Sequence, residues 1–285
     1  MFNYILYRIA QWLVLTLPRR MSYALAVFLS DLHFWFSPRE RRWVRNNLKA
    51  ILGSEQNLHF LNRQVFWNFG KYLVDFLRTP HLDRSNMQNF IELENLHFID
   101  EELKIGNGVI VISAHLGNWE LGGMGMAAAG YRVLVAALEH KDSRVNDFFI
   151  KQRTMQGVEV ATLKNAGKKC WEALKANKFV ALVADRDFSG TGIAVKFFGK
   201  DTLIPKGPAV FSRRNKTAIV PAFVIRQPDD RFKLIFEPPI KPIITNNEEN
   251  DIKEMAQRYA DAIEGYVRRY PTQWLVFREF WIKEH

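Results

Sequence analysis

The sequence predicts an α/β fold in which a mostly parallel central sheet is flanked by helices, with an amphipathic, membrane-associated helical segment at the N-terminus. From about residue 90 onward, short buried strand patterns alternate with helical patterns, which is typical of a parallel sheet covered on both faces. Residues 1–50 differ from the rest because they combine helical apolar periodicity with an excess of positive charge. We therefore expect an interfacial helical segment at 1–50 and a single α/β domain at 51–285.

The composition is that of a folded globular chain. It has 285 residues, of which 48% are hydrophobic and 25% charged, so a sizeable core is expected and disorder is excluded as the main state. The single cysteine, Cys170, excludes an intramolecular disulfide and a cysteine-rich metal cluster. No apolar run reaches the ~18 residues that an ordinary transmembrane helix requires.

Residues 1–50 carry a disproportionate share of the positive charge. Eight basic residues stand there against Asp31 and Glu40, which accounts for six of the ten net positive charges. Ile5, Ile9 and Trp12 recur at helical spacing, and a second apolar stretch covers 21–36. This pattern favours helices lying in a membrane interface. The alternative is that they are core helices of a soluble domain.

The strands and helices of the α/β part follow one another in a regular order. The expected strands are 109–112, 131–138, 179–183, 218–225 and 232–236, and the expected helices are 121–129, 145–153, 166–177 and 250–269. In such folds the active site lies where strands end and helices begin.

The end of the strand at 109–112 carries the first candidate site. Residues 113–123 read SAHLGNWELGG, so His115 comes just after the strand and Glu120 falls near the first helical turn. A carboxylate beside an imidazole fixes its tautomer, and the other ring nitrogen then acts as a general base. The alternative is that His115 caps the turn and Glu120 interacts with the helix terminus. Zinc binding is disfavoured, because no H-E-x-x-H motif or third ligand accompanies the pair.

The end of the strand at 179–183 carries the second candidate site. Asp185, Arg186 and Asp187 follow it directly. Alone, this triplet is also explained by a solvated turn or a local ion pair.

Together these motifs resemble the bacterial lipid A biosynthesis acyltransferases, the lauroyl/myristoyl transferase family of the wider lysophospholipid acyltransferase group. The motifs that carry the resemblance are His115-x₄-Glu120 around GNW at 117–119, Asp185-x-Asp187, FFG at 197–199, PKGPA at 205–209, RNNL at 45–48 and PTQW at 271–274. The C-terminal tail departs from the family, which often has histidine and two arginines where this chain has Phe277, Arg278 and Glu279.

The resemblance implies transfer of a fatty acyl group from an acyl carrier protein or coenzyme A thioester to a hydroxyl of a lipid A precursor or related glycolipid. It implies that 51–285 is the acyltransferase domain, that His115 is the base with Glu120 as its partner, and that the protein works at the cytoplasmic face of the inner membrane. No cofactor or metal is expected besides the thioester co-substrate. The substrate-binding candidates are Gly117, Asn118, Arg153, Asp185, Arg186, Asp187, Lys206 and Gly207.

Other functions stay open. Within the same chemistry, the acceptor is a lysophospholipid or another glycolipid. The alternative from another function class is a non-catalytic lipid-binding membrane protein. Nucleic-acid binding is disfavoured, because no motif of that kind occurs and the basic residues cluster with apolar helices.

Overall fold

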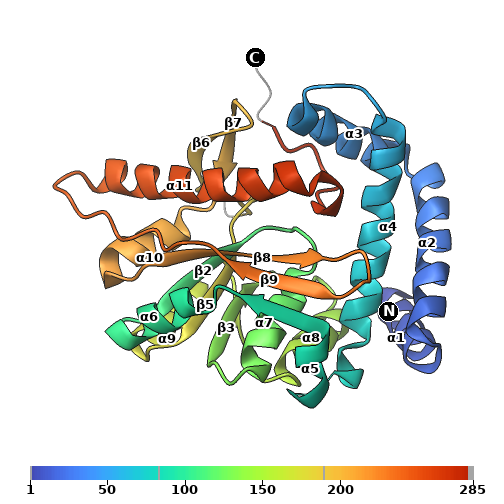
Figure 1. Cartoon of the computed structure of the whole chain (residues 1–285), viewed down its shortest axis with the longest axis horizontal. Helices are drawn as coiled ribbons and strands as arrows, with labels where there is room; N and C mark the ends of the chain where they lie inside the picture. Colours follow the sequence, from blue (N-terminus) through green and yellow to red (C-terminus); the bar gives the residue numbers. More distant parts are fainter. Residues whose placement is uncertain (1, 83, 189, 282–285) are drawn as a thin grey trace.

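The computed structural model describes residues 2–82, 84–188 and 190–281 and has a seven-stranded sheet at its centre (Figure 1). The strand order is β1-β9-β8-β2-β5-β3-β4, and only the β8–β9 pair is antiparallel. The strands are β1 (Ile91–Glu94), β2 (Val109–Ser113), β3 (Val133–Ala137), β4 (Glu159–Thr162), β5 (Phe179–Val183), β8 (Ile219–Arg226) and β9 (Phe232–Phe236). The predicted α/β class with a mostly parallel sheet is confirmed.

Helices cover both faces of the sheet, and successive apolar side chains of β2 point to opposite faces. Ile110 and Ile112 point into one core, which is closed by α9 (Ala166–Lys175), α10 (Gly207–Asn215) and α11 (Glu248–Arg269). Val109 and Val111 point into a second core. That core is closed by α5 (Arg84–Phe90), α6 (His97–Ile105), α7 (Trp119–Ala128) and α8 (Ser143–Thr154). Because both faces are buried, β2 reads as a continuous apolar run.

The FFG motif forms the turn of a separate hairpin, β6 (Ile193–Phe197) and β7 (Lys200–Ile204). Phe197 pairs with Lys200, which leaves a two-residue loop, Phe198 and Gly199, with φ of 50° and 73°. Positive φ at both central positions matches the right-handed twist of a hairpin. The Phe198 N–H donates to Glu264 of α11 at 2.5 Å. The hairpin is thereby fixed to α11.

The N-terminal helices pack beside the sheet, and the first two of them bury only one side. They are α1 (Phe2–Thr16), α2 (Arg19–Phe36), α3 (Pro38–Leu52) and α4 (Leu58–Leu77), and the expected boundary at residue 50 falls inside α3. Phe34, Leu48 and Phe66 form a core shared by α2, α3 and α4. No helix in the described part of the chain is long and apolar enough to span a bilayer.

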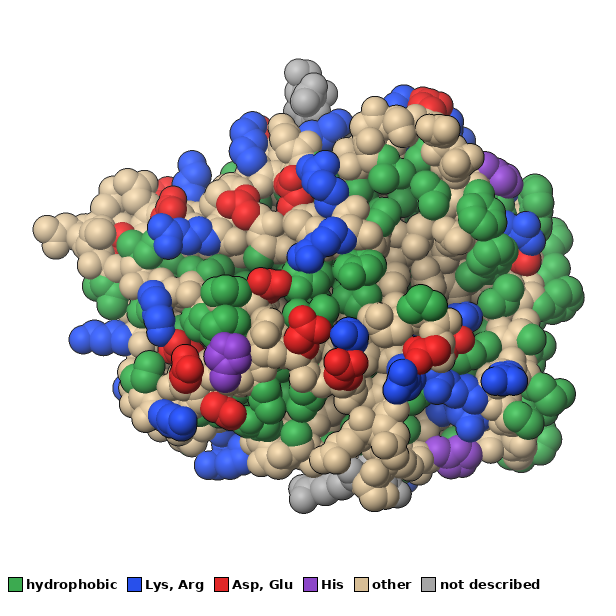
Figure 2. Space-filling model, viewed as in Figure 1, with side chains coloured by type: hydrophobic (Ala, Val, Ile, Leu, Met, Phe, Trp, Pro, Cys, Tyr) green, Lys and Arg blue, Asp and Glu red, His purple; other side chains and the backbone are tan. Residues whose placement is uncertain are grey.

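The other side of α1 and α2 leaves large apolar side chains uncovered (Figure 2). We call these ten residues the apolar face: Ile5, Leu6, Ile9, Trp12, Met21, Phe28, Leu29, Leu32, Trp35 and Phe36. Green side chains gather along the edge of the molecule where Figure 1 places α2. Contiguous exposed apolar surface of this kind marks an interaction site.

A buried polar network connects α2 and α4 to the sheet. The hydroxyl of Tyr23 donates to Asp75, which also pairs with Arg226 of β8. Lys71 pairs with Asp230 at 2.9 Å. Removing one partner would leave a buried charge unpaired, so this network fixes how the N-terminal helices sit against β8.

Candidate active site

The backbone of His115 is held at the carboxyl end of β2, the fully buried central strand. Its N–H donates to Asp185 Oδ2 at 3.1 Å, and its carbonyl accepts from the Leu275 N–H at 2.7 Å. Gly117 then turns the chain with φ of 62°. A Cβ at this position would lie 1.8 Å from the carbonyl oxygen of Val224. Only glycine allows this close approach to β8.

Asp185, and not Glu120, is the carboxylate that meets the His115 ring. Asp185 Oδ1 lies 2.6 Å from His115 Nδ1. The sheet register explains the contact, because Ser113 and Val183 are partners on the parallel strands β2 and β5, and each reacting residue stands two positions further on. Asp185 was expected to bind substrate; the structure pairs it with His115.

The C-terminal segment completes the environment of Asp185. The indole N–H of Trp274 donates to Asp185 Oδ2 at 2.9 Å. This segment is held by Asn47 of the RNNL motif, whose Nδ2 donates to the carbonyls of Val276 and Arg278, both at 3.1 Å. Sequence analysis gave Trp274 no role, although the PTQW motif pointed to the segment.

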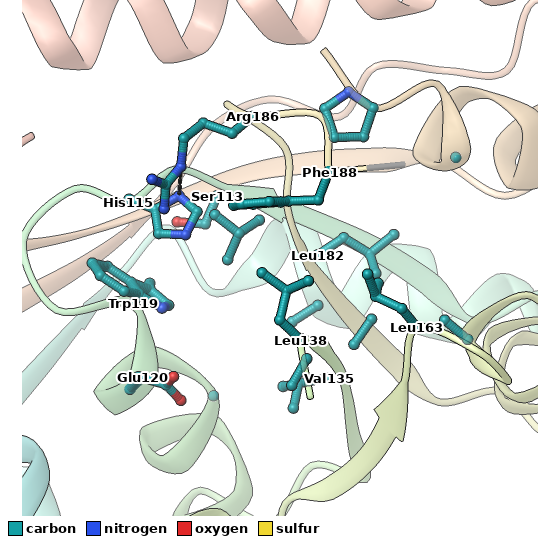
Figure 3. A pocket seen from close by; sticks show the side chains of 18 of the residues that line it. Ser113, His115, Trp119, Glu120, Val135, Leu138, Leu163, Leu182, Arg186 and Phe188 are labelled. Atoms are coloured by element: carbon teal, nitrogen blue, oxygen red, sulfur yellow. Dashed lines mark hydrogen bonds between the residues drawn. The ribbon is translucent and has the colours of Figure 1, made fainter. Parts of the chain in front are cut away.

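Asp185 is ionised in this setting. Burial raises the pKa of its carboxyl, but the charge and hydrogen bond of His115, the Arg186 guanidinium and the Trp274 indole lower it more, to about 2. A carboxylate only accepts, so the Nδ1 proton of His115 points to Asp185 and Nε2 is left as the basic nitrogen. Because Nδ1 donates its proton to Asp185, it cannot also accept from Arg186 Nε, which lies 3.2 Å away (Figure 3). The guanidinium therefore acts as a fixed positive charge beside the imidazole.

Glu120 is paired with Arg153 of α8. The two form a bidentate ion pair of 2.6 and 2.8 Å, with 11% of each side chain exposed. Burial lowers the pKa of Arg153, but the carboxylate of Glu120 raises it more. The implied pairing of Glu120 with His115 is therefore corrected, since both Glu120 oxygens accept from Arg153.

Trp119 lies next to His115. Its ring centroid is 4.8 Å from that of His115, in an edge-to-face arrangement, and 4.5 Å from that of Tyr72, on which it stacks. These contacts restrict the orientation of the imidazole.

His115 faces a cavity of about 880 Å³. The polar part of its lining includes His115, Glu120, Arg153, Arg186 and Lys206. An apolar branch is lined by residues of β3, β5 and the loops after β3 and β4, among them Val135, Leu138, Leu163 and Leu182 (Figure 3). Cys170 of α9 and Phe211 of α10 also line the cavity. A third part reaches the N-terminal helices and the tail at His33, Glu40, Phe277 and Arg278.

The remaining expected site residues divide into two groups. Asp187, Lys206 and Gly207 line the cavity. Gly117 shapes the turn, and the buried Asn118 caps α7 by accepting from the Leu121 N–H at 3.3 Å; neither lines the cavity. Within the described ranges, no three His, Cys, Asp or Glu side chains are grouped to hold a metal.

Comparison with known proteins identifies the family. The family described as bacterial lipid A biosynthesis acyltransferase matches residues 1–283. The chain is similar to a phosphatidylinositol mannoside acyltransferase of Mycolicibacterium smegmatis, at 23% identity over 85% of this chain and 79% of the relative. It is also similar to the lipid A biosynthesis palmitoleoyltransferase of Escherichia coli, at 22% identity over 94% of this chain and 88% of the relative. The chain belongs to the bacterial lipid A biosynthesis acyltransferase family and is an acyltransferase.

Proposed function

We propose that the protein transfers a fatty acyl chain from a thioester to a hydroxyl of a membrane glycolipid, with His115 as general base. The observation that carries the proposal is the cavity in which the His115–Asp185 pair meets an apolar branch. Relatives that act on lipid A and on phosphatidylinositol mannoside support a glycolipid acceptor.

In the proposed reaction, His115 Nε2 takes the proton of the acceptor hydroxyl as its oxygen attacks the thioester carbonyl. Asp185 stabilises the resulting imidazolium at Nδ1. A C–O bond forms, the C–S bond breaks, and the thiolate recovers the proton from His115. Arg186 stabilises the developing oxyanion because its charge is already in place in a buried site.

The apolar branch is suited to the acyl chain of the donor. Its described lining beyond the polar end includes Val135, Leu138, Leu163 and Leu182. Burying an alkyl chain there contributes about 0.8 kcal/mol for each CH₂ group. Acyl carrier protein and coenzyme A both present the same acyl thioester, so either of them fits as the donor.

The apolar face supports docking at a membrane surface, with the cytoplasmic leaflet of the inner membrane as the proposed site. Apolar area and basic side chains both favour an anionic leaflet, and residues 1–50 carry six of the ten net positive charges. The cavity reaches α2 at His33, so an acceptor lipid has a short route from the bilayer to the base.

Lipid mass spectrometry of cells with and without the gene tests the proposal. We expect a glycolipid that gains one ester-linked acyl group only when the gene is present. Purified protein given acyl carrier protein or coenzyme A thioesters then identifies the donor. An acylated lysophospholipid, with no change in any glycolipid, would replace the proposed acceptor; no acyl product of any kind would reject the function.

A further inference from the structure

A second hollow lies between α3 and α4, apart from the catalytic cavity. Its volume is about 280 Å³, and it is lined by Pro38, Arg41, Arg42, Arg45, His59 and Asn62. Three guanidinium groups from one helix and an imidazole from the next thus surround a space large enough for a phosphate with a small alcohol attached.

The positive charge of this hollow is mostly uncompensated. Arg45 pairs with Glu55 at 2.9 Å, and that carboxylate is shared with Lys49. Arg41 donates to the carbonyl of Phe34 at 3.3 Å, and within the described ranges neither Arg41 nor Arg42 has an acidic partner. Converging guanidinium groups without carboxylates favour a bound anion, and their planar donors match phosphate oxygens.

Asn62 forms part of the wall of the hollow. It is 2% exposed, and its Nδ2 donates to the carbonyl of Arg41 at 2.8 Å. Its Oδ1 is buried and has no hydrogen-bond partner in the part of the chain that the structure describes. A buried acceptor without a partner is costly. Because phosphate oxygens are themselves acceptors, this amide oxygen would pair with a hydroxyl or ammonium group carried by the headgroup and not with the phosphate.

The rim of the hollow is aromatic and belongs to the apolar face. Trp35 and Phe36 are 57% and 82% exposed. The His59 ring centroid lies 6.3 Å from that of Trp35, and the Arg41 guanidinium lies 6.0 Å from the Trp35 ring. Exposed tryptophan beside arginine is typical of a side-chain pair at the level of lipid headgroups.

We propose that this hollow binds the phosphate of an anionic phospholipid headgroup while Trp35 and Phe36 enter the interface beside it. The proposal rests on the membrane docking proposed above and adds a defined headgroup site to it. Glu40, next to Arg41 in the chain, lines the catalytic cavity. A headgroup held here therefore orients the molecule so that the α2 side of that cavity lies near the bilayer.

A matched pair of variants separates a headgroup site from diffuse attraction. Arg42→Gln removes a guanidinium from the hollow, whereas Arg39→Gln removes one from the same exposed helix, where Arg39 stacks on Trp43 outside the hollow. Partition of the full chain is measured on phosphatidylcholine vesicles containing phosphatidic acid, and on vesicles containing oleate at the same surface potential. Circular dichroism verifies that both variants are folded.

We expect Arg42→Gln to weaken binding to phosphatidic acid vesicles about tenfold more than Arg39→Gln does, which corresponds to one charge-assisted hydrogen-bonded contact. On oleate vesicles the two variants should be equal. Equal losses on both vesicles would overturn the headgroup site and leave membrane docking standing, whereas failure of the parent to bind any vesicle would overturn both. Acyl transfer to detergent-dispersed acceptor is measured in a separate assay, which distinguishes failure of the proposed function from failure of the headgroup site.

Two other occupants of the hollow would be revealed by different results. Stabilisation of the parent by inorganic phosphate, lost in Arg42→Gln without any change in vesicle binding, would assign the hollow to free phosphate. A loss of activity in Arg42→Gln only with carrier-protein donors, again with unchanged vesicle binding, would assign it to an acidic protein. Either result overturns the lipid site.

Discussion

At the scale of single residues, Asp185 is the buried carboxylate that positions His115. Its carboxylate accepts from the His115 ring, the His115 backbone and the Trp274 indole. Three donors on a fully buried carboxylate favour its charged form strongly. The imidazole is thereby fixed in one tautomer before any substrate binds.

This carboxylate makes stability depend on pH in a defined window. Its folded pKa, about 2, lies below the ordinary 3.8, so its contribution of about 2 kcal/mol is complete above pH 3.8 and is lost as the pH falls toward 2. We expect the free energy of unfolding of the parent to fall more steeply in this window than that of Asp185→Asn. Denaturant unfolding at a series of pH values measures both slopes, and parallel slopes would contradict the assignment.

Glu120 and Arg153 should behave as a structural pair. Glu120→Ala leaves a guanidinium unpaired in a site where it is 11% exposed, and we expect a loss of about 3–5 kcal/mol in the free energy of unfolding. Glu120→Ala combined with Arg153→Met should cost clearly less than the sum of the two single changes. Additive losses in this double-mutant cycle would mean that the pair is not coupled.

The sequence predicted His115 as the base but assigned its partner wrongly. Spacing along the chain favoured Glu120, because it lies five residues away. Asp185 is seventy positions away and meets His115 only because β2 and β5 are adjacent in the sheet. Strand order is not contained in local spacing, so this contact needed the fold.

At the scale of elements, the C-terminal segment contacts the candidate active site through Trp274. Trp274→Phe keeps an aromatic ring but removes the donor to Asp185, together with some buried volume. We expect the free energy of unfolding to fall by about 1.5–3 kcal/mol, the value of a hydrogen bond to a buried charge. We also expect kcat to fall while KM changes little, because the substrate contacts are kept. Denaturant unfolding and steady-state kinetics measure these effects; unchanged stability and kcat would contradict the role.

The elements that were predicted share strong apolar patterns. β5 and β9 were predicted with their observed bounds, and α11 was predicted within two residues. β1, β4 and the β6–β7 hairpin were missed because they are short and interrupted by polar residues, as in β1, where Glu92 and Glu94 alternate with apolar residues. Their pairing is decided by neighbouring strands rather than by their own composition.

At the scale of the whole molecule, the N-terminal helices contribute to the folded core, as one alternative drawn from the sequence states, and their membrane association stays a prediction. Val14 and Tyr23 lie in the second core, with Val109 and Val111 of β2, and Arg78 donates to the carbonyl of Leu17 at 2.9 Å. The apolar face nevertheless stays uncovered. Deleting these helices would damage the fold, so membrane docking is better tested by exposed side chains alone.

Ile9→Ser together with Trp12→Ser provides that test. The two residues are 50% and 62% exposed, so the fold should be unaffected, and we expect vesicle partition to fall about tenfold or more. Ile105→Ser, at a site 59% exposed on α6, is the matched control and should bind as the parent does. Equal binding by all three proteins in a flotation assay would show that the apolar face does not dock.

The central claim is that His115 activates a glycolipid hydroxyl toward an acyl thioester. The most direct measurement is single-turnover acyl transfer by the parent and by folded His115→Ala, with the product identified by mass spectrometry and by its cleavage with mild base, as an ester requires. We expect the parent to form an ester-linked glycolipid and His115→Ala to be slower by about 10²–10⁴-fold. A folded His115→Ala protein that forms the same ester at the parent's rate would contradict the account.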